Sequence, residues 1–146
     1  MPRNRSALAV TAFFLACNAA DPPSAPDAQP LSPGAPTPSG TGANGKLVRT
    51  GYAVTGTATL VVNNGTARLD FSGDFTVGSA PGPFVYVNTT NNANTGKPLR
   101  IAALKSRTGA QSYSFQVPAG VSYTWILIWC DPFNVSIAEA AIQATP

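Results

Sequence analysis

Cys130 is the residue best placed to do chemistry in this chain. It ends the apolar run Trp125-Ile126-Leu127-Ile128-Trp129-Cys130, and the only other cysteine, Cys17, lies near the N-terminus. The chain contains no histidine. A thiol can be oxidised to a sulfenic acid or can form a mixed disulfide with a partner, and both reactions need an exposed thiol that ionises readily. Cys130 is therefore the candidate redox residue.

The neighbours of Cys130 leave two interpretations open. The next residue is Asp131, whose negative charge opposes thiolate formation, so the local sequence favours an inert thiol unless folding brings Lys105 or Arg107 close. A lone buried cysteine is commonly a small hydrophobic core residue. On the other hand, an unpaired thiol is unusual in an oxidising compartment. Cys130 is either a redox centre or a passive core residue.

The absence of histidine from the sequence excludes most other kinds of metal site and catalytic site. Copper sites and the usual Ser-His or Cys-His catalytic pairs need histidine, and an iron–sulfur cluster needs about four thiolates. Asp70 and Asp74 are the only close acidic pair, and they read more simply as a strand residue and a turn residue. We predict no metal site, no catalytic residue and no evident cofactor. Haem held by Cys130 alone is the one cofactor that the residues still permit.

Charge gives no support for nucleic-acid binding. From Cys17 onward, seven basic residues face six acidic ones, and the basic residues form no run and do not alternate with aromatic residues. Charged residues make up only 10% of the chain, whereas it has 13 Gly and 14 Pro. That balance indicates turns and extended segments rather than helices.

Residues 46–146 carry the pattern of a single β-domain. Thr57–Val62 and Thr66–Phe71 alternate between two faces, and Asn64-Gly65 between them supplies the positive φ angles of a tight hairpin turn. Gln111–Val117 alternates in the same way. The segment 138–142 is compatible with either a helical turn or a closing strand. We predict an all-β fold, an antiparallel β-sandwich of about seven to nine short strands.

The strand that ends at Cys130 is apolar on both faces. Trp125, Leu127 and Trp129 alternate with Ile126, Ile128 and Cys130. Such a strand belongs in the centre of a sheet and needs a cover on each side. The outer cover is a loop, the end of the N-terminal tether or a partner protein, and a loop is the simplest of the three because apolar surface is rarely left bare.

The N-terminus has the features of an export signal. Arg3 and Arg5 precede the uncharged, mostly apolar stretch 7–16, which is too short to span a bilayer. Phe14-Leu15-Ala16-Cys17 resembles the lipobox of bacterial lipoproteins, in which the cysteine is acylated and the peptide is cut before it. We therefore expect a signal peptide at residues 1–16 and lipidation of Cys17, which anchors the protein to a membrane. The alternative is ordinary secretion without an anchor. Asn18 favours the outer membrane of the cell envelope if the source has two membranes.

The following segment has the composition of a tether. From Cys17 to residue 45 the chain consists mainly of Ala, Pro, Ser, Gly and Thr, with almost nothing to bury. We expect this segment to be disordered and to span on the order of 30 Å. A protein partner in the envelope would then lie within reach of the tethered domain.

Several runs of the domain resemble a known family. These are Gly51 with Thr55-Gly56-Thr57-Ala58, Leu69 through Asp74-Phe75, Gly82-Pro83-Phe84-Val85-Tyr86-Val87, Gly109-Ala110-Gln111-Ser112-Tyr113, and Ile128-Trp129-Cys130 with Phe133-Asn134-Val135. In this order they resemble the DM-thirteen domain, an extracytoplasmic module found beside DOMON domains and labelled as an electron-transfer domain. The resemblance covers residues 47–142. Two positions depart from it, since Phe84 follows Pro83 where an Asp is usual, and Ser136-Ile137 stands where Phe-Gly is usual.

The resemblance implies a β-sandwich with a redox role that depends on Cys130. Asp74, Trp129, Phe133 and Asn134 come with it as supporting residues, and we expect Trp129 and Phe133 to surround the thiol. Two functions follow. One is a tethered redox or electron-transfer accessory domain centred on Cys130, and the other is a non-enzymatic binding or structural envelope lipoprotein in which Cys130 is passive. The residues give no basis for an enzyme.

Overall fold

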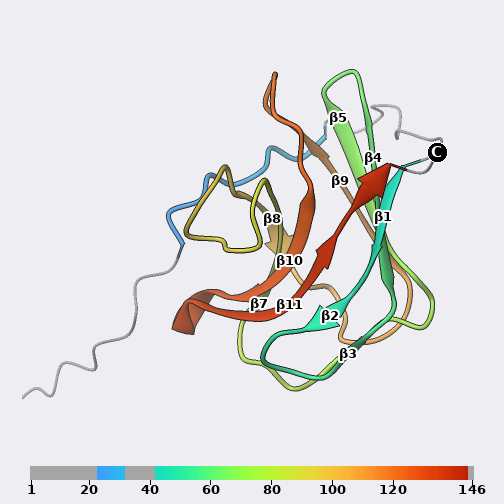
Figure 1. Cartoon of the computed structure of the whole chain (residues 1–146), viewed down its shortest axis with the longest axis vertical. Coiled ribbons are helices and arrows are strands. Elements are labelled where there is room, and N and C mark those ends of the chain that lie inside the picture. The colour runs from blue at the N-terminus through green and yellow to red at the C-terminus, as the bar shows by residue number, and fades with distance from the viewer. Residues whose placement is uncertain (1–22, 32–41, 145–146) are drawn as a thin grey trace, which may run out of the picture.

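The computed structural model describes residues 23–31 and 42–144 (Figure 1). The strands are β1 (Ala43–Lys46), β2 (Val48–Arg49), β3 (Val54–Thr55), β4 (Thr57–Asn63), β5 (Thr66–Phe71), β6 (Thr76–Val77), β7 (Pro83–Asn88), β8 (Leu99–Ala103), β9 (Gln111–Gln116), β10 (Trp125–Cys130), β11 (Val135–Ala141) and β12 (Gln143–Ala144). The helical turn η1 (Asp131–Phe133) follows β10. Eight of these strands have four or more residues, and the other four have two.

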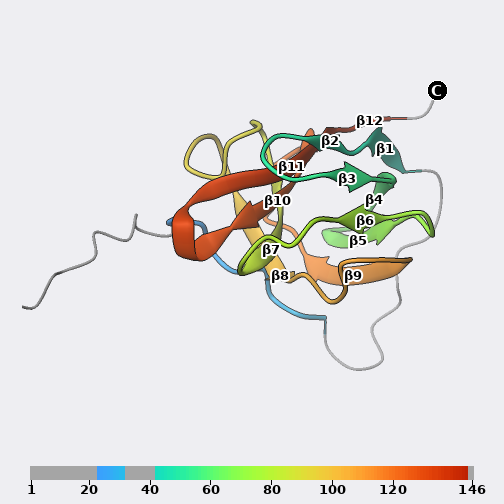
Figure 2. The ribbon, with the colours of Figure 1, turned by 90° about the horizontal axis from the view of Figure 1, so that it is seen from below.

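The strands form two antiparallel sheets that face each other (Figures 1 and 2). Sheet I has the order β12-β1-β4-β5-β9, sheet II has the order β2-β11-β10-β7-β8, and β3 pairs with β6 in a small third sheet. The main core lies between sheets I and II, and its largest fully buried members include Phe75, Phe115 and Leu69. The prediction of an all-β antiparallel sandwich is confirmed.

Local sequence explains the turn that joins β4 to β5. Asn64 and Gly65 both have positive φ angles, 49° and 77°, and form the two-residue turn that joins β4 to β5. The sequence of segment 138–142 is compatible with a helical turn or with a strand. In the structure, residues 138–141 belong to the strand β11. It pairs with both β10 and β2, because a strand in the sheet satisfies the backbone groups that a short helical turn would leave without partners.

Strand β10 lies at the centre of sheet II, between β11 and β7. Its side chains alternate as the sequence predicts. Ile126, Ile128 and Cys130 join the main core, whereas Leu127 and Trp129 belong to a second apolar cluster on the outer face of sheet II. Trp125 packs against that outer cluster. The prediction of a central strand covered on both sides is confirmed.

Two segments supply the outer cover. Residues 89–98 connect β7 to β8 and contribute the buried Ala93, and Ala25 of the N-terminal segment packs against the same cluster. The fully buried Asn88 positions the loop, since its Nδ2 donates to the carbonyl oxygens of Asn92 and Thr95 at 2.7 and 2.9 Å. A buried amide bonded in this way holds a polar loop over an apolar surface. A loop and the end of the tether thus both act as covers.

The structure differs from the expected tether at residues 23–31. This N-terminal segment lies along the edge strands of both sheets: Ala28 N donates to Arg100 O at 2.6 Å, Arg100 N donates to Pro26 O at 2.9 Å, and Gln116 N donates to Gln29 O at 3.0 Å. Ala28 is buried in the main core. Figures 1 and 2 show the segment passing from β8 to β9 across the open side of the sandwich.

The physical reason is that edge strands present free backbone groups. A proline-rich segment is compatible with an extended edge position because it needs only some of its own N–H groups. The strand β1 also begins at Ala43, before the expected end of the tether at residue 45. The expected leader, Cys17 and residues 32–41 lie outside the described residues. Within the described part of the chain, no helix is long and apolar enough to cross a membrane.

Candidate functional site

Cys130 lies at a corner where β10 meets the turn η1 and the chain returns as β11. Its side chain has no exposed surface, and it is a free thiol in the main core. The Sγ atom donates a hydrogen bond to the carbonyl oxygen of Pro81 at 2.8 Å. A completely buried thiol cannot meet a partner thiol without an opening of the structure.

The run Pro81-Gly82-Pro83 closes this corner from the side of β7. Gly82 has φ +51°, and a Cβ atom at this position would lie 2.6 Å from Cδ of Pro132. The backbone of Gly82 is thus in close contact with the first turn of η1, and its carbonyl accepts from Asp131 N at 3.3 Å. Only glycine fits this approach and this φ angle without strain. The close approach of Gly82 to Pro132 thus helps to keep the corner around Cys130 closed.

Folding does not pair either candidate cation with the thiol. The Lys105 ammonium group donates to the carbonyl of Ser112 and lies 4.7 Å from the ring centroid of Tyr113. Arg107 donates to the carbonyl oxygens of Gly78 and Ala80 at 2.6 and 2.5 Å. Arg107 therefore holds the loop that leads into Pro81, and acts on Cys130 only through that loop.

Asp131 carries the densest set of side-chain contacts at the corner. It is only 7% exposed, its Oδ1 accepts from the Tyr86 hydroxyl at 2.7 Å, and its Oδ2 accepts from Arg100 Nε at 2.7 Å. Arg100 also donates to Asp27 Oδ1 at 2.8 Å. A buried carboxylate is tolerated when it is paired and hydrogen-bonded in this way. We call Tyr86, Asp131 and Arg100 the corner network.

A bulge in the ladder between β7 and β8 brings Arg100 to this position. Val85 pairs with Ala102 but Tyr86 pairs with Arg100, so Ile101 is the extra residue. A bulge of this kind redirects side chains beside a site. Arg100 thereby lies next to Tyr86 on the outer face, and its guanidinium carbon lies 3.6 Å from the ring centroid of Phe84. The contact with the ring adds a cation–π attraction to the ion pairs.

Burial and the charges of the network shift two of its pKa values. Burial of the Tyr86 phenol raises its pKa well above the ordinary value, and the hydrogen bond and negative charge of Asp131 act in the same direction. For Arg100, burial acts to lower the pKa, but the hydrogen bonds and charges of Asp27 and Asp131 outweigh it, and the pKa is raised. Tyr86 therefore stays protonated and Arg100 stays charged at neutral pH.

Two of the supporting residues do not surround the thiol as expected. Trp129 points to the outer cluster, on the opposite face of the sheet from Cys130, because neighbouring side chains of a strand alternate. Phe133 is 56% exposed. Asn134 adopts a left-handed conformation after η1, and its Oδ1 accepts from Trp129 Nε1 at 3.1 Å and from Asn94 Nδ2 at 3.0 Å. Asn134 thus joins the corner to the cover loop.

Asp74 belongs to a different part of the molecule. It lies between β5 and β6, where its Oδ1 accepts from the Ser72 hydroxyl at 2.5 Å and its carbonyl accepts from Thr55 Oγ1 at 2.7 Å. In Figure 2, β6 and the helical turn after β10 lie toward opposite ends of the sandwich. Asp74 stabilises its own turn, in agreement with the simpler interpretation of the acidic pair.

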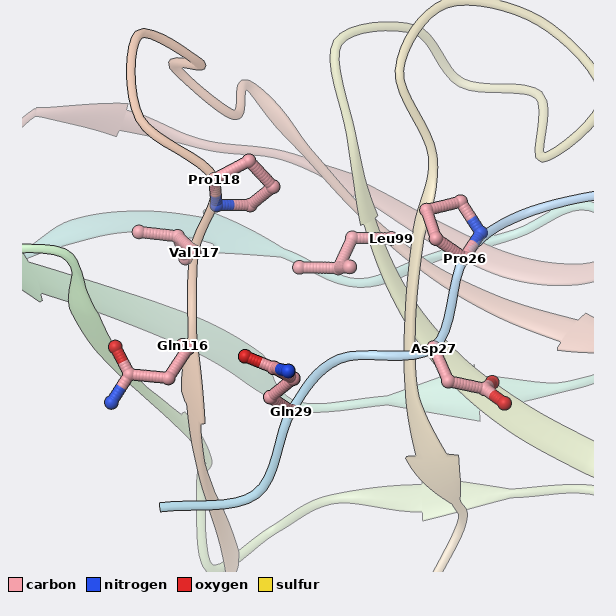
Figure 3. A pocket seen from close by; sticks show the side chains of 7 residues that line it. All are labelled: Pro26, Asp27, Gln29, Leu99, Gln116, Val117 and Pro118. Carbon is pink, nitrogen blue, oxygen red and sulfur yellow. The ribbon is translucent and has the colours of Figure 1, made fainter. Parts of the chain in front are cut away.

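The structure also has a hollow at its open side (Figure 3). Its volume is about 320 Å³, and it is lined by Pro26, Asp27, Gln29, Leu99, Gln116, Val117 and Pro118. In Figure 3 the Leu99 side chain points toward Val117, and the carboxylate of Asp27 is turned away from them. The hollow is thus lined by the N-terminal segment, by Leu99 of β8 and by the end of β9. Cys130 does not line it, and within the described residues no group of three or more His, Cys, Asp or Glu side chains is arranged to hold a metal.

A comparison with family models identifies the domain. The model described as electron transfer DM13 matches residues 46–142, which include both sheets and the Cys130 corner. The chain belongs to the DM13 electron-transfer family. Comparisons with curated proteins and with solved structures gave no significant match. The expected family is confirmed, and with it an electron-transfer-related role for this DM13 domain.

A haem bound through Cys130 does not fit the corner. The Sγ atom has no exposed surface, and Pro81 occupies the direction in which its proton points. An iron atom could reach the sulfur only if the Pro81-Gly82-Pro83 run moved away from η1. The residues of this DM13 domain therefore offer no axial-ligand geometry at Cys130 in the folded state.

Sequence reasoning missed the corner network. The sequence alone indicates only a negative charge beside the thiol for Asp131 and only a strand position for Tyr86. One signal was present, because a tyrosine inside an apolar strand needs a partner for its hydroxyl. The identity of that partner depends on the bulge at Ile101 and on the turn η1, and neither can be read from the local sequence.

Proposed function

We propose that this DM13 domain is a membrane-tethered, extracytoplasmic accessory domain in electron transfer, centred on Cys130. The match to the electron-transfer family over residues 46–142 carries the proposal. The position of Cys130 supports it, because the thiol lies directly beside Asp131 and thus beside the buried corner network. A buried ionised cluster is a common feature of functional sites.

Thiol chemistry at Cys130 requires opening of the corner. The thiol is buried and donates to the carbonyl of Pro81, so it reacts only when the Pro81-Gly82-Pro83 run separates from η1. Labelling of the native full chain with a thiol reagent at neutral pH tests this role. Rapid labelling supports a reactive Cys130, and labelling only after denaturation refutes thiol chemistry in the folded state. An absorption spectrum of the protein purified from its host tests for haem or another chromophore.

The lipid anchor is part of the same proposal. The lipobox-like sequence places the acylated residue at Cys17, only six positions before Pro23, where the described segment begins. Six extended residues span at most about 20 Å, so the start of the docked N-terminal segment would lie within about 20 Å of the anchored residue. Membrane fractionation tests the anchor. The natural chain is expected in the membrane fraction and a Cys17→Ser variant in the soluble fraction, and equal distribution of the two contradicts it.

One observation favours a second candidate function. The complete burial of Cys130 is what a passive core residue shows, and it is compatible with a non-enzymatic binding or structural lipoprotein of the envelope. A Cys130→Ser variant separates the candidates, since a serine hydroxyl can donate to Pro81 in the same way. Loss of electron transfer to the natural partner in a folded Cys130→Ser variant supports a role of the thiol in the transfer. Unchanged transfer supports a passive Cys130, and absence of any transfer in the natural chain supports the binding or structural function.

A further inference from the structure

We propose that Tyr86 is a redox-active tyrosine of this domain, with Asp131 as its proton acceptor and Trp129 as the neighbouring aromatic ring through which the electron leaves. This inference rests on the electron-transfer role in the proposed function, but not on the part of it that is centred on Cys130, and it assigns the transfer to the outer face of sheet II. It starts from the hydrogen bond between the Tyr86 hydroxyl and Asp131 Oδ1, which is 2.7 Å long.

The first step of the argument is the partner of the phenol. A tyrosine is difficult to oxidise unless its proton leaves together with the electron, because the radical cation is a very strong acid. A carboxylate can accept that proton, whereas a carbonyl or an amide cannot. Tyr86 is completely buried, so Asp131 is the acceptor at hand rather than bulk water. The geometry is therefore that of a proton-coupled electron donor.

The second step is the environment of the acceptor. Arg100 donates to the other carboxylate oxygen, Oδ2, at 2.7 Å, and Arg100 is itself held by Asp27. Oδ1 is thus left to face the phenol. When the proton moves over the 2.7 Å bond it stays within the corner network, from which it can return to the phenolate oxygen on reduction.

The electron and proton balance is simple. A one-electron acceptor, such as an oxidised metal centre of a partner protein, takes one electron from Tyr86. The O–H bond of Tyr86 breaks, its proton joins Oδ1 of Asp131, and the products are a neutral tyrosyl radical, a neutral carboxylic acid and the reduced acceptor. Re-reduction by one electron from a donor protein, with return of the proton, restores the starting state.

The third step is the route of the electron. Tyr86 and Trp129 are buried in the same outer cluster. Tyr86 pairs across the sheet with Leu127, and Trp129 pairs with Phe84, so Tyr86 and Trp129 are diagonal neighbours on one face. Their Cα atoms are then about 7–8 Å apart, which large aromatic side chains bridge. Electron transfer between rings at such a separation does not need a metal.

The fourth step is access for a partner. The indole Nε1 of Trp129 donates to Asn134, which lies directly after Phe133, and Phe133 is the exposed aromatic residue of the corner. The hydrogen bond to Asn134 links the buried indole to the end of the turn η1, where an electron acceptor can dock. The buried Tyr86 needs no contact with the partner.

The chain contains a matched control in Tyr113. It is also buried and its hydroxyl also donates a 2.7 Å hydrogen bond, but the acceptor is Oε1 of Gln111, a neutral amide oxygen. Cys130 provides a second contrast, since its proton points to the carbonyl of Pro81. Neither acceptor can take up a proton. The proposal thus distinguishes Tyr86 from two other buried oxidisable groups of the same domain.

Photochemical oxidation of the full chain tests the inference. The probe is a photogenerated ruthenium(III) polypyridyl complex, and the readouts are transient absorption and electron paramagnetic resonance of the tyrosyl radical. Tyr52 and Tyr123 are only partly buried, so the background for all samples carries Tyr52→Phe and Tyr123→Phe, which leaves Tyr86 and Tyr113 as the tyrosines. Circular dichroism confirms that each variant is folded.

We expect a tyrosyl radical that is abolished by Tyr86→Phe, unchanged by Tyr113→Phe and formed more slowly in heavy water. Trp129→Phe is expected to slow its formation. A radical that persists in Tyr86→Phe, or no radical in the background chain, overturns the inference. These outcomes are independent of the labelling of Cys130 and of electron transfer in the folded Cys130→Ser variant, so the inference can fail while the proposed function stands.

Discussion

The two faces of strand β10 end in oxidisable residues with opposite surroundings. On the inner face, Cys130 donates its proton to a backbone carbonyl and is sealed by Gly82 against Pro132. On the outer face, Trp129 lies in the same cluster as Tyr86, whose proton faces the carboxylate of Asp131. Strand β10 thus carries on one face a thiol without a base, and on the other face an indole that lies beside Tyr86 of β7, a phenol with a base.

The difference shows that the type of residue alone does not make a redox site. Both faces are buried, so burial does not distinguish them. What distinguishes them is the acceptor for the proton that must move with the electron. The sequence draws attention to the cysteine because it is rare, whereas the structure surrounds a common tyrosine with the groups that a proton-coupled reaction needs.

The largest effect is expected from a break in the inner seal. Gly82→Ala combines a positive φ with a Cβ that would lie 2.6 Å from Pro132. The left-handed conformation costs about 1–2 kcal/mol and overpacking costs about 1–3 kcal/mol more. We expect the free energy of unfolding to fall by about 2–5 kcal/mol and thiol labelling of Cys130 to accelerate. Chemical denaturation and labelling rates measure both.

The matched control for that change is Gly109→Ala. Gly109 also has a positive φ, +83°, but a Cβ there meets nothing within 4 Å. It should cost only the conformational part, about 1–2 kcal/mol, and leave the labelling rate of Cys130 unchanged. Equal effects of the two variants on labelling would show that Gly82 does not seal the thiol.

A somewhat smaller effect is expected on the outer face. Tyr86→Phe leaves Oδ1 of the buried Asp131 without its donor, which costs about 1–3 kcal/mol. Tyr113→Phe should cost less, about 1 kcal/mol, because Gln111 Oε1 still accepts from Ser106 N, and Lys105 N, which loses the Tyr113 hydroxyl as its acceptor, belongs to an exposed residue. Thermal or urea unfolding of the two variants measures the difference. The importance of Asp131 as an acceptor is contradicted if Tyr113→Phe is the more destabilising change.

Alkaline pH sharpens the same comparison. The pKa of Tyr86 is raised in the folded state by burial and by Asp131. Above the ordinary tyrosine pKa of about 10, the unfolded chain loses this proton while the folded chain keeps it, so the free energy of unfolding falls as the pH rises. Burial raises the pKa of Tyr113 and Tyr123 as well. Unfolding followed from pH 8 to 12 should therefore show a smaller fall in Tyr86→Phe, and an identical fall would refute the shift.

The smallest effect is expected where the N-terminal segment meets the network. Asp27 is largely exposed, and an exposed ion pair contributes about 0.2–1 kcal/mol. Asp27→Ala should therefore lower the free energy of unfolding by no more than that, because the backbone bonds of Pro26 and Ala28 to Arg100 remain. Hydrogen exchange of the Ala28 amide measures whether the segment stays docked. Loss of its protection in Asp27→Ala would show that the ion pair, and not the backbone pairing, holds the segment.

Much of the fold could be predicted from the sequence because it depends on local patterns. The alternation in Thr66–Phe71, the turn at Asn64-Gly65 and the two apolar faces of Trp125–Cys130 each fix a local feature that the structure confirms. The docking of Pro23–Leu31 could not be predicted in this way. Its composition is that of a disordered segment, and its partners are the edges of β8 and β9, which exist only after folding.

Of the residues at the candidate site, the sequence draws attention mainly to Cys130. Cys130 stood out because it is rare, but the corner network depends on a bulge that turns Arg100 toward Tyr86 and on the turn that places Asp131 beside both. Trp129 and Phe133 lie close to Cys130 in sequence, yet alternation along the strand and the turn η1 direct them elsewhere. Proximity in sequence is therefore a poor guide to the surroundings of a residue at the end of a strand.

The most direct measurement exposes Tyr86 and Cys130, which lie on opposite faces of sheet II, to the same oxidant in one sample. The full chain in the Tyr52→Phe/Tyr123→Phe background is exposed to the photogenerated ruthenium(III) oxidant. The tyrosyl radical is quantified by electron paramagnetic resonance, and the Cys130 thiol is then counted after denaturation. The account predicts a radical that depends on Tyr86, with the thiol intact. Loss of the thiol without a tyrosyl radical would contradict it.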